Sequence, residues 1–164
     1  MSNTADRVGP EVVPGSLLQR GSWHTLASMS DRQRISSGLP YELIVGYSRA
    51  VRVDQHVYVS GTTPQWPDGT VEPTAEGQVR RCFEIIEKAL MEAGGSLSDV
   101  VRTRIYLVSA SDVRAVEKVH SELFGDVRPA NSTVVVAALL NPEWLVEIEA
   151  DAVIALRDRE HTGA

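Results

Sequence analysis

The sequence predicts an α+β fold in which two helices lie on one face of a mixed β-sheet. Three observations favour this class: segments of alternating apolar and polar residues, two segments with apolar residues at helical spacing, and Gly- and Pro-rich turns between them. The 164 residues are 43% hydrophobic and 23% charged, as is typical of a single globular domain. We expect the order β-β-α-β-α-β and a four-stranded sheet, whose second face requires polar residues or a partner.

The first 33 residues differ in composition from the rest of the chain. Gly, Pro, Ser and Thr are frequent in residues 1–33, which predicts a loosely structured extension. An alternative is an arm that packs on a neighbouring subunit through Trp23. We expect the domain to span residues 34–157, followed by a short tail at residues 158–164. No apolar signal core or membrane-length apolar run is present, so we expect a soluble, cytoplasmic protein with no membrane partner.

Two short strands are expected at residues 47–53 and 56–60, where β-branched and aromatic residues flank a turn at Asp54. Residues 61–74 follow as a loop, because this stretch contains three prolines and two glycines.

A helix is expected at residues 75–93, with Thr74 as its N-cap and Gly94 at its end. Its apolar residues recur every three or four positions and form one stripe: Val79, Cys82, Phe83, Ile86, Leu90 and Ala93. We interpret Cys82, the single cysteine, as a core residue and not as a catalytic thiolate; it cannot form an internal disulfide.

The rest of the chain predicts a strand at residues 100–107, a helix at residues 112–124, and strands at residues 130–137 and 145–156. Alternation in the first of these strands predicts that Val101, Thr103, Ile105 and Leu107 share one face, opposite Arg102, Arg104 and Tyr106.

Three acidic residues, Glu147, Glu149 and Asp151, alternate along one face of the last expected strand. Arg102 and Arg104 alternate in the same way on another strand. One interpretation is a charge-paired sheet face at a subunit contact. The other is that one carboxylate positions a water molecule in a cleft.

Composition and motifs exclude several classes of function. The 22 acidic residues outnumber the 16 basic ones, and the net charge of -6 argues against binding to nucleic acid. The four histidines have no partners at metal-ligand spacing, so we expect no metal site. The chain also contains neither a P-loop nor a serine-hydrolase elbow.

Four segments carry a resemblance to a known family. They are residues 45–51 (VGYSRAV), 59–64 (VSGTTP), 128–133 (RPANST) and 146–152 (VEIEADA). In this order they resemble the motifs of the RidA/YjgF (Rid) family, and the likeness runs over residues 34–156.

The resemblance implies a chorismate-mutase-like fold and a homotrimer with clefts between subunits. It also implies hydrolysis of enamines and imines, such as 2-aminoacrylate, to ketoacids and ammonia, without a metal or organic cofactor. By the same resemblance, Tyr47 closes the cleft, Ser60 and Gly61 contact the small-molecule substrate, and Glu147 holds the attacking water.

One departure from the family pattern concerns the substrate carboxylate. Archetypal members clamp it with an arginine, and the residue at that position here is Asn131; we expect Asn131 and Thr133 to contact the substrate. Glu117 also departs, since archetypal members have asparagine there. Three arginines are candidates for a replacement clamp: Arg49, Arg102 and Arg104.

The leading hypothesis is therefore a divergent Rid-family enamine/imine deaminase-type hydrolase with altered substrate specificity. The alternative is a non-catalytic trimer that binds a small molecule or has a regulatory role. Isomerisation of a dicarboxylate, as in chorismate mutases, is a third hypothesis.

Overall fold

The structure is a computed structural model that describes residues 32–155. The expected extension up to residue 31, with Trp23, and the expected tail at residues 158–164 lie outside the described residues. No helix within the described range is both long and apolar enough to cross a membrane.

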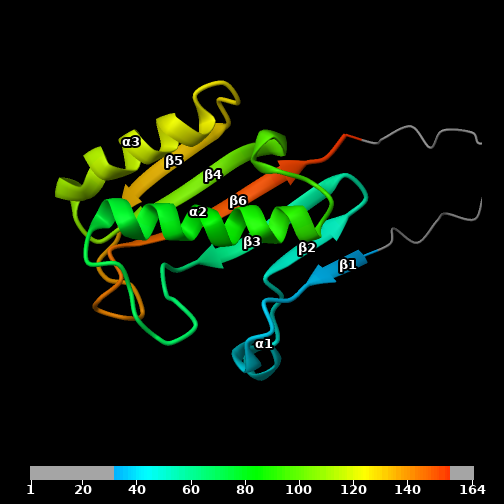
Figure 1. The fold of residues 1–164 in the computed structure, drawn as a ribbon, viewed down its shortest axis with the longest axis horizontal. Coiled ribbons are helices and arrows are strands. Elements are labelled where there is room, and N and C mark those ends of the chain that lie inside the picture. The colour runs from blue at the N-terminus through cyan, green and yellow to red at the C-terminus, as the bar shows by residue number, and fades with distance from the viewer. Residues whose placement is uncertain (1–31, 156–164) are drawn as a thin grey trace, which may run out of the picture.

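Six strands form one mixed sheet, and the helices α2 and α3 cover one of its faces (Figure 1). The elements in chain order are β1 (Arg32–Ile35), α1 (Pro40–Val45), β2 (Ala50–Val53), β3 (His56–Thr62), α2 (Ala75–Glu92), β4 (Val100–Leu107), α3 (Val113–Phe124), β5 (Ala130–Val135) and β6 (Val146–Val153). The strand order across the sheet is β1-β2-β3-β6-β4-β5, and only the β4–β5 pair is parallel among these strands. The predicted class, a mixed sheet with two helices on one face, is confirmed.

The expected number of four strands is wrong. Both β5 and β6 belong to the sheet, and β1 adds an edge strand that pairs with β2. This edge strand begins at Arg32, two residues before the expected start of the domain. Short edge strands carry too few residues for an alternating pattern, which is why β1 was not predicted.

Helix α1 was also not predicted, because its burial is the reverse of an ordinary amphipathic helix. Leu43 and Ile44 are 90% and 78% exposed, whereas Glu42 is 5% exposed. The Glu42 carboxylate accepts hydrogen bonds from the hydroxyls of Ser36 and Ser37, which fixes the turn between β1 and α1. The helix projects from the sheet (Figure 1), and these apolar side chains are exposed.

Helix α2 matches its prediction closely. The Thr74 side chain accepts a hydrogen bond from the amide of Gly77 at 3.1 Å, and Gly94 adopts a φ of 87° just after the helix. Cys82 is fully buried on the apolar stripe, and burial raises the pKa of its thiol, so it stays protonated within the core.

The predicted shared face of β4 is wrong at one position. Val101 is 45% exposed, and Val100 is buried instead. The register with β6 shifts between Val100 and Arg102, which indicates a bulge. An extra residue in a strand reverses the faces on either side of it, so Thr103, Ile105 and Leu107 still share one face, which is buried.

Gln78 joins α2 to the segment that leads into β6. The side chain is 1% exposed. Its Nε2 donates to the carbonyls of Glu72 and Glu143 at 2.8 and 2.9 Å, and its Oε1 accepts from the amide of Leu145 at 2.7 Å. One amide thus satisfies three backbone groups and holds Leu145, which is one residue before β6 begins and two residues before Glu147.

We expect Gln78→Leu to lower the free energy of unfolding by about 3 kcal/mol, because it leaves three backbone groups without partners in the interior. Urea denaturation at a fixed protein concentration measures this loss. Gln33→Leu is the control: its side chain is on the exposed edge strand, and the expected change is within about 0.5 kcal/mol. Equal losses in the two variants would contradict the role assigned to Gln78.

Candidate active site

The three acidic residues of β6 lie on the sheet face that the helices leave open. The alternating residues Val146 and Ile148 are fully buried beneath the helices. Arg104 on β4 donates to Glu149 Oε2 at 3.3 Å and to Asp151 Oδ2 at 3.1 Å. The charge-paired interpretation therefore holds for two of the three carboxylates.

Glu147, the third carboxylate of β6, forms no salt bridge with any of the described residues. Burial raises its pKa, and the nearby charge of Glu149 adds to that effect, whereas the charge of Arg49 opposes it. A Cβ on residue 61 would overlap Oε1 of Glu147 and lie 3.2 Å from its Cδ, so the close approach of the two segments requires Gly61. A desolvated carboxylate without an ion pair is a suitable proton acceptor.

A set of hydrogen bonds holds the strand end at Ser60 and Gly61 against the segment that precedes β2. The Ser60 hydroxyl donates to the carbonyl of Ser48 at 2.8 Å. In return, Nη2 of Arg49 donates to the carbonyls of Ser60 and Gly61, both at 2.7 Å. These bonds bring the backbone at half-buried Tyr47 beside the same turn. The structure thus places Ser60, Gly61 and the Tyr47 segment together, with Glu147 in contact with Gly61.

Asn131 and Thr133 lie elsewhere, on the edge strand β5. They share the helix-covered side with Thr103, which is paired with Asn131 in the β4–β5 register. Asn131 Nδ2 donates to the Thr103 hydroxyl at 2.9 Å, and the Thr133 hydroxyl donates to Asn131 Oδ1 at 3.1 Å. Since β4 separates β5 from β6 and the side chains point to opposite faces, one chain does not bring Asn131 together with Glu147.

A groove of about 610 Å³ runs between α3 and β5, and Asn131 and Thr133 line it. His120 on α3 also lines this groove, 3.0 Å from the Thr103 hydroxyl, and burial lowers the pKa of its imidazole, which is therefore neutral at pH 7. His120 was expected, like the other histidines, only to lack partners at metal-ligand spacing, and no role at a site was predicted for it. Glu117, the second departure from the family pattern, lines the same groove.

The three arginines considered as a replacement clamp are placed differently from one another. Arg104 is engaged by the carboxylates of β6, Arg49 lies behind the glycine turn, and Arg102 is exposed on β4. The arginine that lines the α3–β5 groove is Arg128, whose Nε donates to the carbonyl of Gly125 at 3.0 Å. Arg128 was noted only as the first residue of the segment 128–133. Its place in the groove depends on the turn between α3 and β5, which the motif does not predict.

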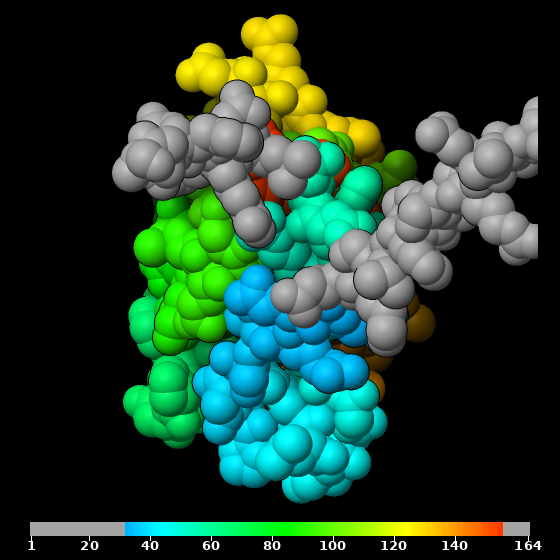
Figure 2. Space-filling view, turned by 90° about the vertical axis from the view of Figure 1, so that its right-hand side faces the viewer, coloured from blue at the N-terminus to red at the C-terminus, as the bar shows by residue number. Residues whose placement is uncertain are grey.

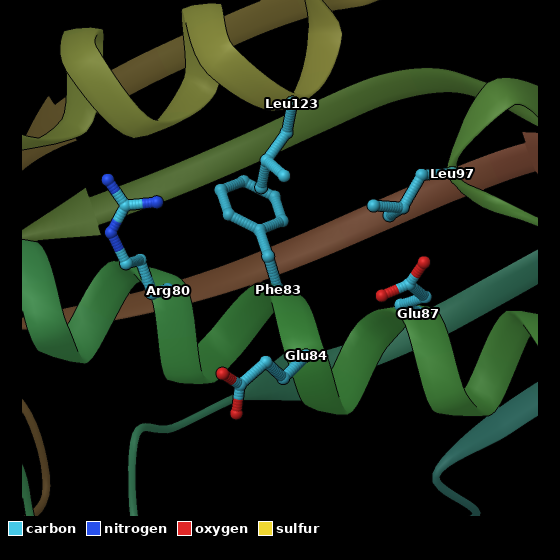
Figure 3. A pocket seen from close by; sticks show the side chains of 6 residues that line it. All are labelled: Arg80, Phe83, Glu84, Glu87, Leu97 and Leu123. Atoms are coloured by element: carbon cyan, nitrogen blue, oxygen red, sulfur yellow. The ribbon is translucent and has the colours of Figure 1, made fainter.

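A smaller hollow lies between α2 and α3, with a volume of about 140 Å³ (Figure 3). Phe83 and Leu123 form its apolar part, and charged side chains of both signs surround them. Arg80 at this rim already pairs with Glu76 and Glu122 at 2.9 and 2.6 Å, so its charge is occupied. Within residues 32–155, no group of three or more His, Cys, Asp or Glu side chains is arranged to hold a metal ion.

The fold and these residues define a class: small α+β domains with an open sheet face that carries a desolvated glutamate against a glycine turn. The model of the endoribonuclease L-PSP family matches residues 40–154. The chain therefore belongs to this family, which is the RidA/YjgF family of the resemblance.

Known proteins agree with this assignment. A structure of a YjgF/YER057c/UK114 family member from Mycobacterium tuberculosis is 47% identical, with a TM-score of 0.70, and the match covers 76% of this chain and all of that one. RidA from an Antarctic Psychrobacter is 35% identical with a TM-score of 0.62, covering 66% and 88% of the two chains. The 3-aminoacrylate deaminase RutC of Acinetobacter baylyi is 38% identical over 65% of this chain and 85% of its own length. The expected RidA/YjgF-like fold is thus confirmed.

We expect two substitutions to move the pKa of Glu147 in opposite directions. Glu149→Gln removes a like charge and lowers it, whereas Arg49→Gln removes an opposite charge and raises it. Carboxyl ¹³C chemical shifts followed through a pH titration measure both changes. Glu87→Gln, on the exposed side of α2, is the control and leaves the value unchanged. Shifts in the same direction for the first two variants would contradict the placement of these charges.

Proposed function

We propose that the protein is an enamine/imine deaminase-type hydrolase that acts on a small metabolite, with Glu147 as its catalytic residue. The observation that carries this proposal is the partly desolvated Glu147 carboxylate, which lies against the Gly61 turn and has no ion pair within residues 32–155. The similarity to a relative named 3-aminoacrylate deaminase supports the reaction class.

The chemistry requires one well-placed base. Glu147 holds a water molecule and accepts its proton while the water oxygen attacks the carbon of the C=N bond. Glu147 returns this proton to the nitrogen, which gives the neutral carbinolamine. The carboxylate then relays the hydroxyl proton to the nitrogen, the C–N bond breaks, and ammonia leaves as the C=O bond forms. The net reaction consumes one water and yields one carbonyl compound and one ammonia. No oxidation or reduction takes place, and we expect no metal or organic cofactor to be needed.

We further propose that the site is completed between copies of the chain in a homotrimer. In one chain, the groove with Asn131 and the carboxylate of Glu147 lie on opposite faces of the sheet, two strands apart. Apolar side chains remain exposed on the open face and at the β5 edge; Tyr58 and Val134 are 51% and 48% exposed. Association would bury these side chains and set the groove of one copy against the Glu147 turn of another.

Asn131 gives the proposed cleft a specificity that differs from an arginine clamp. Its amide is neutral, and both ends of it are already bonded, to Thr103 and Thr133. The groove also holds Glu117, which pairs with Arg114 at 2.8 Å, and Arg128, which lies apart from Asn131 at the turn after α3. We therefore propose a substrate that does not depend on a bidentate grip on its carboxylate.

We expect Glu147→Gln to reduce ammonia release by about 10²- to 10⁴-fold, because the amide keeps the shape of the side chain but accepts no proton. Ammonia released from freshly generated iminopyruvate and from a panel of neutral imines measures the rate. Asp151→Asn is the matched control, since it removes a carboxylate from the same face of β6 but leaves Glu147 in place; it keeps most of the activity.

The non-catalytic binding trimer is the second candidate, and the internally bonded amide of Asn131 favours it. In that case wild type and Glu147→Gln release ammonia no faster than buffer, while small ligands raise the melting temperature of both. This outcome would overturn the hydrolase proposal.

A further inference from the structure

A second pocket, separate from the α3–β5 groove, has a volume of about 290 Å³. It is enclosed by the turn between β1 and α1, the loop after β3, and one face of α2. The residues that matter for its chemistry are Ser37, Arg49, Thr63, Trp66, Arg81 and Lys88. Figure 2 shows how the β1–α1 segment lies against α2 at this end of the molecule.

The lining of this pocket is basic. Arg81 and Lys88 are seven residues apart on α2 and so share one helix face, and Arg49 reaches the pocket from the segment before β2. No Asp or Glu is among the lining residues. The two cations on α2 have exposed carboxylates nearby: Glu84 lies 3.1 Å from Arg81 Nη1, and Glu92 lies 4.0 Å from Lys88 Nζ. Glu42 and Glu147 are the carboxylates that influence Arg49.

Two guanidinium donors in this pocket are buried without an acceptor. The Nε atoms of Arg49 and Arg81 have no hydrogen-bond partner among the described residues. The charge of Glu42 acts to raise the pKa of Arg49, but the Glu42 carboxylate already accepts hydrogen bonds from the hydroxyls of Ser36 and Ser37. Buried guanidinium groups that lack partners at Nε are costly, and an anion in the adjacent pocket would offset their positive charge.

The pocket is also held in shape before any ligand arrives. The guanidinium of Arg81 stacks on the ring of Trp66 at 3.8 Å. Trp66 in turn donates its indole N–H to Glu72 Oε1 at 3.1 Å. Arg49 is fixed by its bonds to the carbonyls of Ser60 and Gly61. Donors that are already oriented lose little entropy when they bind.

We propose that this pocket binds a small organic anion whose oxyanion group, a carboxylate or a phosphate, accepts hydrogen bonds from Arg49 and Arg81 and is neutralised further by Lys88. Guanidinium groups match the planar arrangement of such oxygens. The volume lies at the lower end for ligand pockets, which fits a small metabolite. This pocket shares Arg49 with the turn that faces Glu147, but its other two cations, Arg81 and Lys88, lie on α2 and have no part in the proposed hydrolysis.

The indole N–H of Trp66 is the natural probe, because it lies at the pocket wall. The chain has three tryptophans, so a ¹H–¹⁵N spectrum of the full chain shows three indole signals, and Trp66→Phe identifies the relevant one. Inorganic phosphate and succinate are titrated separately, with chloride holding the ionic strength constant. We expect a saturable shift of the Trp66 signal with at least one of the two anions.

Arg81→Gln and Lys88→Gln are each expected to weaken that binding at least tenfold. Arg114→Gln is the matched control; it removes the same charge from an exposed position on α3 and leaves the affinity unchanged. Tighter binding of phosphate assigns a phosphorylated ligand, and tighter binding of succinate assigns a carboxylate. Glu147→Gln retains the binding, which separates this site from the hydrolytic one.

The proposal is overturned if neither anion produces a saturable shift. It is also overturned if Arg114→Gln weakens binding as much as Lys88→Gln, because the effect would then be general charge screening.

Discussion

The central strand β6 imposes the constraint on which the rest of the structure depends. It is hydrogen-bonded on both sides, and its even-numbered residues, such as Ile148, fill the core beneath the helices. The pleat then places three carboxylates on the opposite face, where successive side chains lie about 7 Å apart along the strand. Arg104 neutralises Glu149 and Asp151, which leaves Glu147 to be accommodated by other means.

The accommodation of Glu147 links packing to chemistry. The missing side chain of Gly61 makes room for the carboxylate, and Arg49 holds the same turn through backbone carbonyls while its charge partly offsets the desolvation. Gln78 fixes the start of β6 from the other side of the sheet. Glu147 is half-buried and has no ion pair among the described residues, so its pKa is raised, and that is the property a proton acceptor in hydrolysis requires.

The sequence predicted well those elements that a local residue pattern determines. It predicted poorly those features that depend on how one strand pairs with another. The apolar stripe and cap of α2 predicted that helix almost to the residue. The exposure of Val101 was not predictable, because a bulge between two strands leaves no mark in one of them. The separation of Asn131 from Glu147 follows from strand order and facing, which motif spacing does not contain. Arg49 appeared only as a clamp candidate, since its bonds to a neighbouring turn depend on tertiary packing.

The proposal that the catalytic site forms between copies is tested most directly by mixing two inactive variants. Glu147→Gln lacks the proton acceptor, and Asn131→Trp fills the groove; each alone is expected to be inactive. When the two are unfolded and refolded together, clefts with both halves intact form in mixed trimers. We predict recovery of about a quarter of the wild-type rate of ammonia release, as random assortment of two halves gives. A mixed sample no more active than its parents would contradict a site shared between chains.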